Sequence, residues 1–442
     1  MSTKGPRVIA HQILNRVEGG AYADILLDSM LSNMGRLDAA FTTELVYGVL
    51  RWSIRLDWAI DSFSSIKTAK LERGVLNALR LGAYQLLFLT KVPASAAINE
   101  SVNLIRGGGS KKAGFVNAVL RKIDSERDGI KLPGTEDDPV RHISVLYSHP
   151  EWLVRRWMGR YGFEETAGLC KAAQEVPPRV IRVNTLLATR EGLIEELALA
   201  KEGRGAKATE FSPDGIIISG ERVEAKDKRY YIQDEASQIV PYLLSAAPGE
   251  AVLDACSAPG GKTTHIAQLM KNTGVICALD VNASRVKAVE DLAERLGVKI
   301  IKTFEADAAQ PLSEGLPAFD AILCDAPCSG LGVIRRTPDI KLKRREGDIA
   351  GISETQKKIL DNVSGYVKKG GRIVYSTCTF EPEETDENIE WFLGRHRDFI
   401  LEDARRFLPQ SCEALVDSGG FLRTFPHRHN MDGFFAARLK KV

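Results

Sequence analysis

The sequence predicts a multidomain protein with an all-α N-terminal domain, a small α+β middle subdomain and a C-terminal α/β domain of the Rossmann-like, doubly wound type. Three observations lead to this prediction. Apolar residues recur at helical spacing through the first 125 residues, short strands and helices mix in the middle, and strands alternate with helices from about residue 250 onward. Because 442 residues exceed one ordinary core, we expect separate domains at 1–130, 140–240 and 241–442.

The N-terminal region, residues 6–125, is predicted to be all-helical. Five stretches return apolar residues every three or four positions: PRVIAHQILNRV, TTELVYGVLRWSIRLDWAI, RGVLNALRLGAYQLLFL, AAINESVNLI and GFVNAVLRKI. The short runs VPAS and GGGS separate the later helices. Residues 125–138 are polar, contain Pro and Gly, and are predicted to be a linker.

The middle and C-terminal segments carry the predicted strands. The middle is expected to hold helices at HPEWLVRRWMGRYG and REGLIEELALA and strands at PRVIRVNTL and DGIIIS. Beyond it, the apolar stretches AVLDA, VICALD, IIKTFEAD, AILCDAP and RIVYSTC alternate with helices, which is typical of a parallel sheet. FILED and GFFAARL are predicted to add two more strands.

Composition narrows the class of protein without identifying it. The chain is 44% hydrophobic and 27% charged, with a net charge of +2. Residues 1–130 hold 17 Lys and Arg against 12 Asp and Glu, a weak indication of an anionic partner. No apolar run is long enough to span a membrane and no signal peptide is evident, so we expect a cytoplasmic protein with reduced cysteines. The seven cysteines lack zinc spacing, and no metal is expected.

The stretch AVLDACSAPGGKTTHIAQLM predicts a strand, a Gly-rich turn and a helix whose N-terminus can bind a ligand. Its spacing matches neither a Walker A loop nor a dinucleotide fingerprint, and purely structural glycines are the alternative. Asp280, Asp307 and Asp325 lie at the ends of the following strands. Each could simply cap a helix. Together they suit a nucleoside cofactor without phosphate, because a pyrophosphate would be repelled, and S-adenosylmethionine has that character.

Two cysteines, Cys328 and Cys378, follow the C-terminal ends of predicted strands, where ligands bind in this architecture. Core packing is the alternative, and Cys256, Cys277 and Cys324 could be core residues, although Cys256 lies in the Gly-rich loop. Carbon 5 of a pyrimidine attacks a sulfonium methyl group only after a thiolate has added to carbon 6. One Cys as nucleophile, one Cys assisting release and one Asp near N3 would make a coherent set.

Four motifs carry a family resemblance: DACSAPGGKTTHIAQLM, DAPCSGLGVIRRTPDIK, YSTCTFEPEETDENI and GFLRTFPHRHNMDGFFAARLKK. They resemble the bacterial 16S rRNA cytosine-5 methyltransferase B family (Sun/Fmu), within the RNA 5-methylcytosine methyltransferases. The resemblance covers nearly the whole chain. Residues 1–125 resemble the helical RNA-binding fold of the antitermination factor NusB, through LVYGVLR, INESVNL and GFVNAVLRKI. The middle segment resembles the small mixed subdomain that precedes the catalytic domain.

The resemblance implies a role for each site residue. Cys378 is implied as the nucleophile, Cys328 as the thiol that assists release, and Asp325 and Lys262 as further catalytic residues. Contacts to S-adenosylmethionine are implied for Cys256, Ser257, Ala258, Pro259, Gly260, Gly261, Lys262, Asp280, Arg285, Asp307 and Asp325. The substrate implied is a cytidine in naked or partly assembled 16S rRNA, and we expect a monomer. Ser257, Thr337 and Leu342 depart from the residues that are commoner in the family, the last two on the substrate side.

The basic run after Pro-Cys is the candidate for RNA binding. It comprises Arg335, Arg336, Lys341, Lys343, Arg344 and Arg345. Phosphate binding is favoured over a solvated helix face. Two other functions compete with the main interpretation. An amino-methyltransferase needs an Asp/Asn-Pro-Pro-aromatic motif, which DAPC is not, and a non-catalytic RNA-binding protein would not need the cofactor loop and both cysteines.

Overall fold

The computed structural model describes residues 5–199, 205–219, 224, 226–312 and 316–442. The chain folds into two compact units. One consists of Met1–Val176 and Ile334–Glu346, and the other of Pro177–Val333 and Gly347–Val442. The boundaries 1–130, 140–240 and 241–442 stay a prediction, since compactness and fold type divide a chain by different criteria.

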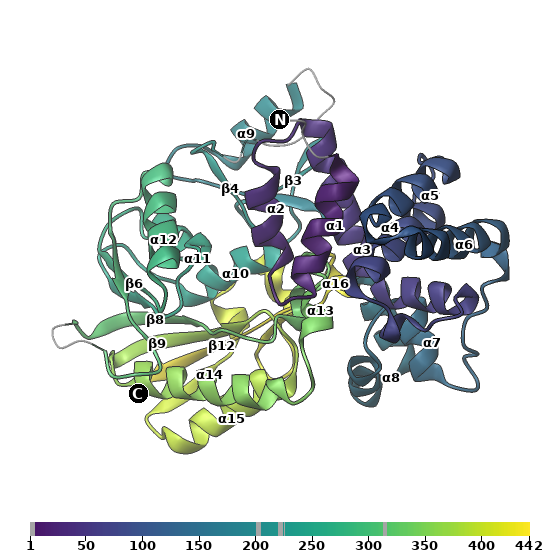
Figure 1. Ribbon diagram of the computed structural model, residues 1–442. Helices are drawn as coiled ribbons and strands as arrows, with labels where there is room; N and C mark the ends of the chain where they lie inside the picture. The colour runs from purple at the N-terminus through teal and green to yellow at the C-terminus, as the bar shows by residue number, and fades with distance from the viewer. Residues whose placement is uncertain (1–4, 200–204, 220–223, 225, 313–315) are drawn as a thin grey trace. The chain divides into compact units, whose positions relative to one another are not determined.

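The first unit is helical, as predicted (Figure 1). Its main helices are α1 (Pro6–Val17), α2 (Ala23–Leu31), α3 (Arg36–Phe63), α4 (Arg73–Phe88), α5 (Ala94–Asn103), α6 (Ser110–Glu126), α7 (Pro139–Leu146) and α8 (Glu151–Ala172). The predicted stretches lie on α1, α3, α4, α5 and α6, whereas α2 was not predicted. Helices α1 to α6 share one apolar core. Close packing of α3 on α4 requires Gly48, because a Cβ there would lie 2.0 Å from Cζ of Tyr84.

A short helix, α13 (Ile340–Lys343), belongs to this first unit although it lies far along the chain. The segment that carries it is joined to the helical region by hydrogen bonds. Lys341 Nζ donates to the carbonyl oxygen of Arg51, and Lys343 Nζ donates to that of Ala21. The backbone N–H of Ala23 in turn donates to Asp339. Residues that directly follow the Pro-Cys motif are therefore part of the helical unit's fold.

The second unit contains two sheets. The smaller sheet is antiparallel with the order β2-β3-β1-β4 and is accompanied by α9 (Arg190–Leu199). Its strands are β1 (Arg179–Val183), β2 (Ala206–Ala208), β3 (Gly215–Ile218) and β4 (Tyr230–Ile232). The strands and the helix predicted for this segment are confirmed. Arg182 and Asn184, two polar residues of the stretch PRVIRVNTL, are fully buried.

The larger sheet has the order β10-β12-β9-β8-β5-β6-β7. Strands β5 to β9 are parallel, whereas β12 runs antiparallel to β9 and pairs with β10 and the short strand β11. The bounds are β5 (Ala251–Asp254), β6 (Val275–Asp280), β7 (Ile301–Glu305), β8 (Phe319–Asp325), β9 (Val367–Thr377), β10 (Phe399–Glu402), β11 (Leu422–Thr424) and β12 (Phe434–Lys441). The predicted doubly wound sheet is confirmed.

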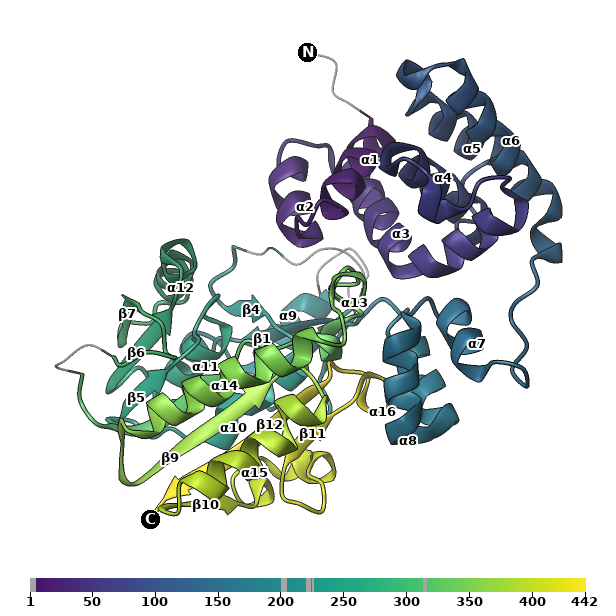
Figure 2. The same cartoon turned by 60° about the horizontal axis from the view of Figure 1, so that its bottom comes forward.

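Helices cover both faces of this larger sheet (Figure 2). One core holds apolar residues of α10 (Glu235–Leu244), α11 (Gly261–Leu269) and α12 (Ala283–Leu296). The other core holds those of α14 (Asp348–Ser364) and α15 (Asp386–Arg395). Because helices bury both faces of the sheet, we expect ligands to bind at the edge formed by the C-terminal ends of the parallel strands. This is the edge at which β5, β6, β8 and β9 end in the polar and cysteine motifs.

Candidate active site

The Gly-rich loop runs from the end of β5 to the start of α11. Gly260 is the N-cap of α11 and has φ +100°, a backbone conformation that favours glycine. A Cβ at Gly260 would lie 3.2 Å from both the Cα of Val289 and a methyl group of Leu292. Ser257 holds the loop against β6, because its backbone N–H and its hydroxyl both donate to the carbonyl oxygen of Leu279. The loop thus presents the N-terminus of α11 at the ligand-binding edge.

The smaller sheet supports this loop from behind through Arg182. The buried guanidinium donates to the carbonyl oxygen of Gly261, to the side-chain oxygen of Gln233 and to the hydroxyl of Thr264. Desolvation lowers the pKa of Arg182 to about 10, so it still carries a charge at neutral pH. Arg182, which lies in the stretch PRVIRVNTL, therefore positions the Gly-rich loop.

The predicted carboxylates lie at or just beyond the ends of their strands. Asp280 ends β6, and its side chain is nearly buried. The Arg285 guanidinium lies 3.5 Å from Oδ2 of Asp280 and donates to the carbonyl oxygen of Ala258 at 3.3 Å, so Arg285 links the loop to this carboxylate. Asp307, two residues after β7, is exposed and accepts a hydrogen bond from the backbone N–H of Ala309. Asp280 and Arg285 are joined directly, whereas Asp307 stands apart on the surface.

The two motif cysteines are side by side, as their positions on neighbouring strands imply. Cys378 follows β9 directly, Cys328 lies three residues beyond β8, and their sulfur atoms are 3.1 Å apart. The hydrogen bond to Cys378 raises the pKa of the Cys328 thiol, and burial raises it further. The raised pKa favours the protonated form of Cys328, although either sulfur atom could be the donor in this hydrogen bond.

Backbone packing fixes the two cysteine loops against each other. The N–H of Gly332 donates to the carbonyl oxygen of Cys378 at 3.0 Å. A Cβ at Gly332 would lie 2.0 Å from the carbonyl oxygen of Gly433 and 2.8 Å from that of Cys378. Only glycine permits this approach. Gly332, the second glycine of the stretch CSGLG, thus sets the spacing between the Pro-Cys and Thr-Cys loops.

Lys262 and Asp325 form an ion pair next to the thiols. The Nζ of Lys262 lies 2.6 Å from Oδ2 of Asp325, whose Oδ1 accepts a hydrogen bond from the hydroxyl of Ser376 at 2.7 Å. Burial acts to lower the pKa of Lys262. The attraction of Asp325, Cys378 and Asp254 outweighs burial and raises that pKa, so the ammonium stays charged. The cation fixes Asp325 and favours negative charge on Cys378.

Three residues of this site were missed in the sequence. Ser376 binds Asp325, the Phe434 ring lies 4.9 Å from Nζ of Lys262, and Asp254 is buried beside Thr263. Burial raises the pKa of Asp254 to about 7. Asp254 ends its strand as Asp280 and Asp325 do, and this shared position was the signal available. Ser376 stands opposite Asp325 in the register of β8 and β9, which the sequence does not show.

Three further cysteines, Cys256, Cys277 and Cys324, have the environment of core residues. Cys324 lies fully buried in β8 and Cys277 is buried in β6, and burial raises the pKa of each thiol. Burial also raises the pKa of Cys256 in the cofactor loop. A thiol held in its neutral form by apolar surroundings is a poor nucleophile. The structure therefore favours packing for these three.

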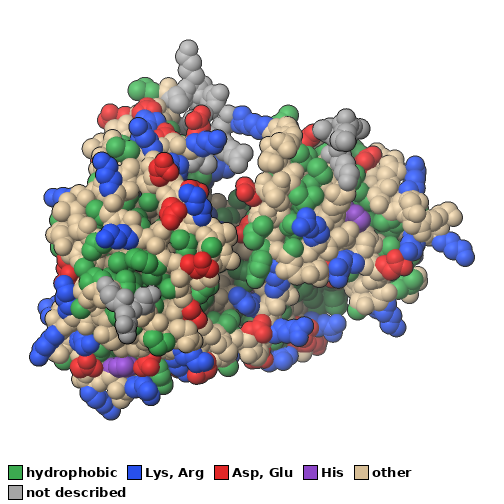
Figure 3. All heavy atoms as spheres, turned by 60° about the vertical axis from the view of Figure 1, so that its left-hand side comes forward, with side chains coloured by type: hydrophobic (Ala, Val, Ile, Leu, Met, Phe, Trp, Pro, Cys, Tyr) green, Lys and Arg blue, Asp and Glu red, His purple; other side chains and the backbone are tan. Residues whose placement is uncertain are grey.

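The basic run after Pro-Cys differs from its prediction. Arg335 and Lys341 are buried, so neither the phosphate-binding interpretation nor that of a solvated face holds for them. Lys343 is half-buried and pairs with Asp339. Arg345 is exposed and Arg344 half-buried. On the face drawn in Figure 3, Lys and Arg side chains are interspersed with Asp and Glu.

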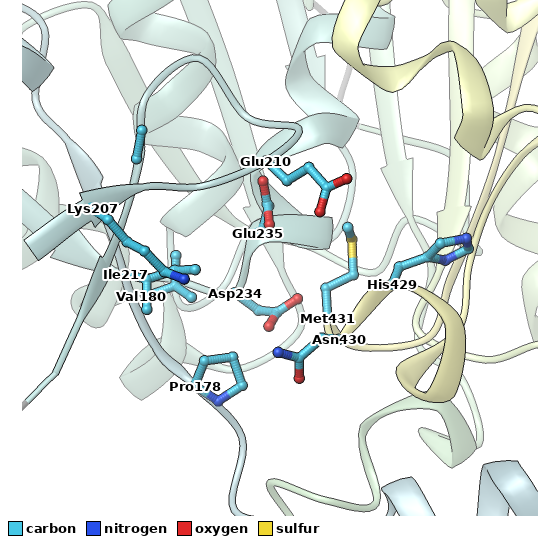
Figure 4. Close-up of a pocket in the computed structure, with 11 residues that line it drawn as sticks. Pro178, Val180, Lys207, Glu210, Ile217, Asp234, Glu235, His429, Asn430 and Met431 are labelled. Carbon is cyan, nitrogen blue, oxygen red and sulfur yellow. The ribbon is translucent and has the colours of Figure 1, made fainter.

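A cavity of about 210 Å³ lies in the second unit between the smaller sheet and the segment that follows α16 (Pro426–His429). In Figure 4, Val180, Lys207 and Ile217 line it from the sheet, and Asn430 and Met431 line it from the C-terminal segment. Its lining contains neither motif cysteine, so this cavity is distinct from the thiol pair.

Two features are absent from the described residues: a cluster suited to a metal ion and a membrane-spanning helix. In the part of the chain that the structure describes, no cluster of three or more His, Cys, Asp or Glu side chains could hold a metal ion. None of the helices in those same ranges is long and apolar enough to cross a membrane.

Comparison with known proteins adds independent information. Residues 241–440 match the family model described as 16S rRNA methyltransferase RsmB/F, residues 4–125 match the NusB family, and residues 149–223 match the ferredoxin-like domain of RsmF/B-like methyltransferases. The probable ribosomal RNA small subunit methyltransferase B of Bacillus subtilis is 38% identical over the full length of both chains. The Pseudomonas putida ribosomal RNA small subunit methyltransferase B is 34% identical over 99% of this chain and 98% of its own.

Solved structures agree with these relatives. The crystal structure of PH0851 matches with a TM-score of 0.82 at 29% identity, over 99% of both chains. NSun6 from Pyrococcus horikoshii, solved with SFG, matches with a TM-score of 0.60 at 26% identity, over 67% of this chain and 99% of its own. A NusB domain, a ferredoxin-like subdomain and a methyltransferase domain follow one another along the chain. The chain belongs to the RsmB/F family of S-adenosylmethionine-dependent 16S rRNA methyltransferases.

Proposed function

We propose that this protein transfers a methyl group from S-adenosylmethionine to carbon 5 of a cytidine in 16S rRNA, through a covalent bond between Cys378 and carbon 6 of the base. The observation that carries the proposal is the pair of thiols 3.1 Å apart beside the Lys262–Asp325 ion pair. Methylation of an exocyclic nitrogen or of a ribose needs no nucleophilic thiol. Methylation at pyrimidine carbon 5 does need one, and a second thiol beside it can assist release.

The residues at the strand ends suit S-adenosylmethionine, which supplies an electrophilic methyl group when bound. Asp280 is nearly buried at the end of β6 and can accept hydrogen bonds from a ribose diol. The loop Cys256–Gly261 presents the N-terminus of α11 to the ligand, and Gly260 packs closely against Val289 and Leu292 of α12. Carboxylates at Asp280 and Asp325 favour a cationic ligand over a phosphate. We assign cofactor contacts to this loop, Lys262, Asp280, Arg285, Asp307 and Asp325, of which Arg285 and Asp307 are exposed.

Cys378 begins the reaction as a thiolate, with Lys262 nearby to stabilise its charge. Its sulfur adds to carbon 6 and the electrons of the 5,6 double bond move into the ring. Asp325, held by Lys262 and Ser376, is placed to interact with N3 of the base. After carbon 5 has accepted the methyl group, its proton must leave. The electrons of that C–H bond re-form the double bond and those of the C–S bond return to Cys378.

Cys328 assists this last step in our proposal. It lies in van der Waals contact with the nucleophile, and its loop is fixed to the Cys378 loop by Gly332. The S–H of Cys328 can give its proton to the Cys378 sulfur as the C–S bond breaks, and the Cys328 thiolate so formed can then take up the proton that leaves carbon 5. Without Cys328, the bond between Cys378 and the base should persist after methylation.

The test of the proposal is methylation of 16S rRNA fragments with labelled S-adenosylmethionine, followed by nucleoside analysis. We expect label in 5-methylcytidine. Label at another position, or on a ribose, would contradict the proposal.

Two substitutions then separate the cysteines. Cys378→Ala should abolish methylation and covalent bonding to RNA. Cys328→Ala should accumulate a protein–RNA adduct that survives denaturing electrophoresis. Cys412→Ala, a buried cysteine that is not in either motif loop, is the matched control and should form product normally. If Cys328→Ala released product at the wild-type rate, the role of Cys328 would be wrong.

A further inference from the structure

The stretch YSTCTFEPEET contains a buried carboxylate, Glu384, to which neither the motifs nor the proposed mechanism gives a role. Glu384 ends the short 3-10 helix η5 (Pro382–Glu384), six residues after Cys378, and is completely buried. A buried carboxylate is costly unless it is paired or hydrogen-bonded. Its contacts therefore indicate what it does.

Those contacts lead directly to the Pro-Cys loop. Oε2 of Glu384 accepts a hydrogen bond from the backbone N–H of Ser329, the residue after Cys328, at 2.8 Å. It accepts a second one at 3.0 Å from the side-chain amide of Gln356 on α14. The same amide donates to the carbonyl oxygen of Pro327, the residue before Cys328, at 2.9 Å. Glu384 and Gln356 thus hold the chain on both sides of Cys328.

The supporting network is rigid and buried. Oε1 of Gln356 accepts hydrogen bonds from the amide of Asn388 and the hydroxyl of Tyr375. The Tyr375 hydroxyl also lies 2.8 Å from the backbone carbonyl oxygen of Glu384. These bonds fix the orientation of Gln356, so that its amide group faces Glu384. Burial raises the pKa of Glu384, and the two N–H donors on one oxygen oppose this effect by favouring its ionised form.

The other carboxylate oxygen of Glu384 is buried and has no hydrogen-bond partner among the residues that the structure describes. Its negative charge is incompletely compensated and acts on its neighbours. No lysine or arginine in the described ranges forms an ion pair with it. The cation of this region, Lys262, is paired with Asp325 on the Cys378 side of the thiols.

We propose that Glu384 is a positioning residue that makes the two cysteines unequal: its carboxylate holds the Pro-Cys loop and keeps the proton on Cys328, while Lys262 favours the thiolate on Cys378. Two identical side chains 3.1 Å apart share one hydrogen bond, and their surroundings decide which of them loses the proton. Besides the bond to Cys378 and burial, the charge of Glu384 raises the pKa of Cys328. On the other side of the pair, the ammonium of Lys262 is attracted to Cys378.

Other ionisable groups near the thiols do not supply this asymmetry. Tyr375 is neutral, because burial raises its pKa well above the usual value. Asp325 is neutralised by Lys262. Glu381 lies on the same short segment as Glu384 and repels it, which adds to the effect of burial on the pKa of Glu384. Glu384 is the carboxylate that is bonded to the Cys328 loop itself.

The proposal rests on the proposed function for its meaning, but its test needs neither RNA nor cofactor. Alkylation of the free full-length protein by iodoacetamide, followed by peptide mass spectrometry, gives the reactivity of each thiol against pH. In the wild type, Cys378 should react at lower pH than Cys328. In Glu384→Gln, which keeps an acceptor for Ser329 and Gln356, the profile of Cys328 should move down by about one pH unit, a roughly tenfold gain in thiolate at a given pH.

Two further variants complete the experiment. Glu387→Gln makes the same change at an exposed position on α15 and should leave both profiles unchanged. Lys262→Met should move the profile of Cys378 to higher pH, and it keeps the proposal testable if Glu384→Gln fails to fold. An unchanged Cys328 profile in folded Glu384→Gln overturns the role of Glu384. A Cys378 profile unaffected by Lys262→Met overturns the role of Lys262 in the same asymmetry. Neither outcome bears on methylation at carbon 5, which the separate RNA assay tests.

Discussion

Two buried lysines, one in each compact unit, are used in opposite ways. Lys262 on α11 forms an ion pair with Asp325 at 2.6 Å, and the attraction of nearby negative groups raises its pKa. Lys341 on α13 is fully buried, and its Nζ donates to the carbonyl oxygen of Arg51 at 2.8 Å. No carboxylate pairs with Lys341 among the described residues. Burial, the largest cause, lowers its pKa well below the usual value.

The comparison shows that burial alone does not reveal the role of a cation. A carboxylate partner keeps Lys262 charged, and the charge can then act on a reacting group. A carbonyl partner gives Lys341 one hydrogen bond but little compensation for desolvation, so burial favours the neutral form of this long hydrogen-bond donor within the helical unit. It closes the attachment of the segment 334–346 to α3. The predictions below test this contrast.

The largest effect is expected for the charge of Lys262. Lys262→Met should slow methyl transfer by about 10²- to 10³-fold, because Asp325 loses its partner and Cys378 loses the cation that favours its thiolate. Single-turnover methylation of an rRNA fragment measures this. Lys341→Met is the matched variant in the other unit and should stay within about threefold of the wild-type rate. Equal losses in both variants would remove the distinction between the two lysines.

The second prediction concerns Asp254, the buried acid beside Lys262. Burial raises its pKa to about 7 from 3.8, so the native state retains a proton that the unfolded chain has lost. The stability due to the protonated acid is full below about pH 4 and declines as the pH rises toward 7. By linkage, the decline is on the order of 3–4 kcal/mol. Asp254→Asn keeps an acceptor for Thr263 and should remove this decline.

Thermal unfolding of Asp254→Asn and wild type at several pH values measures the effect. The two midpoints should be close at pH 4, and the variant should unfold several degrees higher at pH 8. Lys262 also acts on Asp254, but the attraction of nearby negative groups raises the pKa of Lys262, so it stays charged across this range and should not reverse the trend. A constant difference between the two proteins from pH 5 to 8 would contradict the assigned pKa.

Much of this molecule follows from local sequence patterns, and the two lysines show where such patterns fail. Periodicity predicted α1, α3 and the parallel strands, because each of these buries one face or both against a core. The strand-end positions of Cys328 and Cys378 predicted that both lie at the ligand-binding edge, since parallel strands have their C-terminal ends at one edge of the sheet. Lys341 looked like a phosphate ligand because its run is basic, but its partner, Arg51, lies 290 residues away.

The same limit applies to Glu384 and Ser376. Their partners, Ser329 and Asp325, lie 55 and 51 residues away in sequence, and only the strand register and the fold of two loops bring them together. Helix α2 was missed for another reason. It is only nine residues long and has neither a side-chain cap at its N-terminus nor a basic residue in its last turn. Short elements with weak boundary signals depend on tertiary packing.

A smaller effect is expected when Lys341 is replaced. Lys341→Met should change the free energy of unfolding at pH 7 by no more than about 1 kcal/mol, because one hydrogen bond is lost and apolar contact is gained. The lowered pKa means that the native state binds fewer protons than the unfolded chain, so this lysine costs more stability as the pH falls. The variant should therefore gain on the wild type at low pH and lose that advantage toward pH 10.

Thermal midpoints of the variant and the wild type at pH 6, 8 and 10 test this prediction. A charged, paired lysine would behave differently, because its removal would leave a buried carboxylate and destabilise the protein by about 3–5 kcal/mol. A loss of that size in Lys341→Met would show that Lys341 is charged. The contrast with Lys262 would then be wrong.

The smallest effect is expected at Arg345, an exposed member of the basic run whose buried members are Arg335 and Lys341. If Arg345 contacts a phosphate, Arg345→Gln should weaken RNA binding several-fold and reduce the slope of log affinity against log salt by about one. Lys287→Gln, at an exposed position on α12, removes the same charge and serves as the control. Binding of an rRNA fragment measured from low to moderate salt gives both slopes. Identical slopes for the two variants would mean that Arg345 is solvated and contacts no phosphate. The phosphate-binding interpretation would then fail for Arg345, as it already does for the buried Arg335 and Lys341.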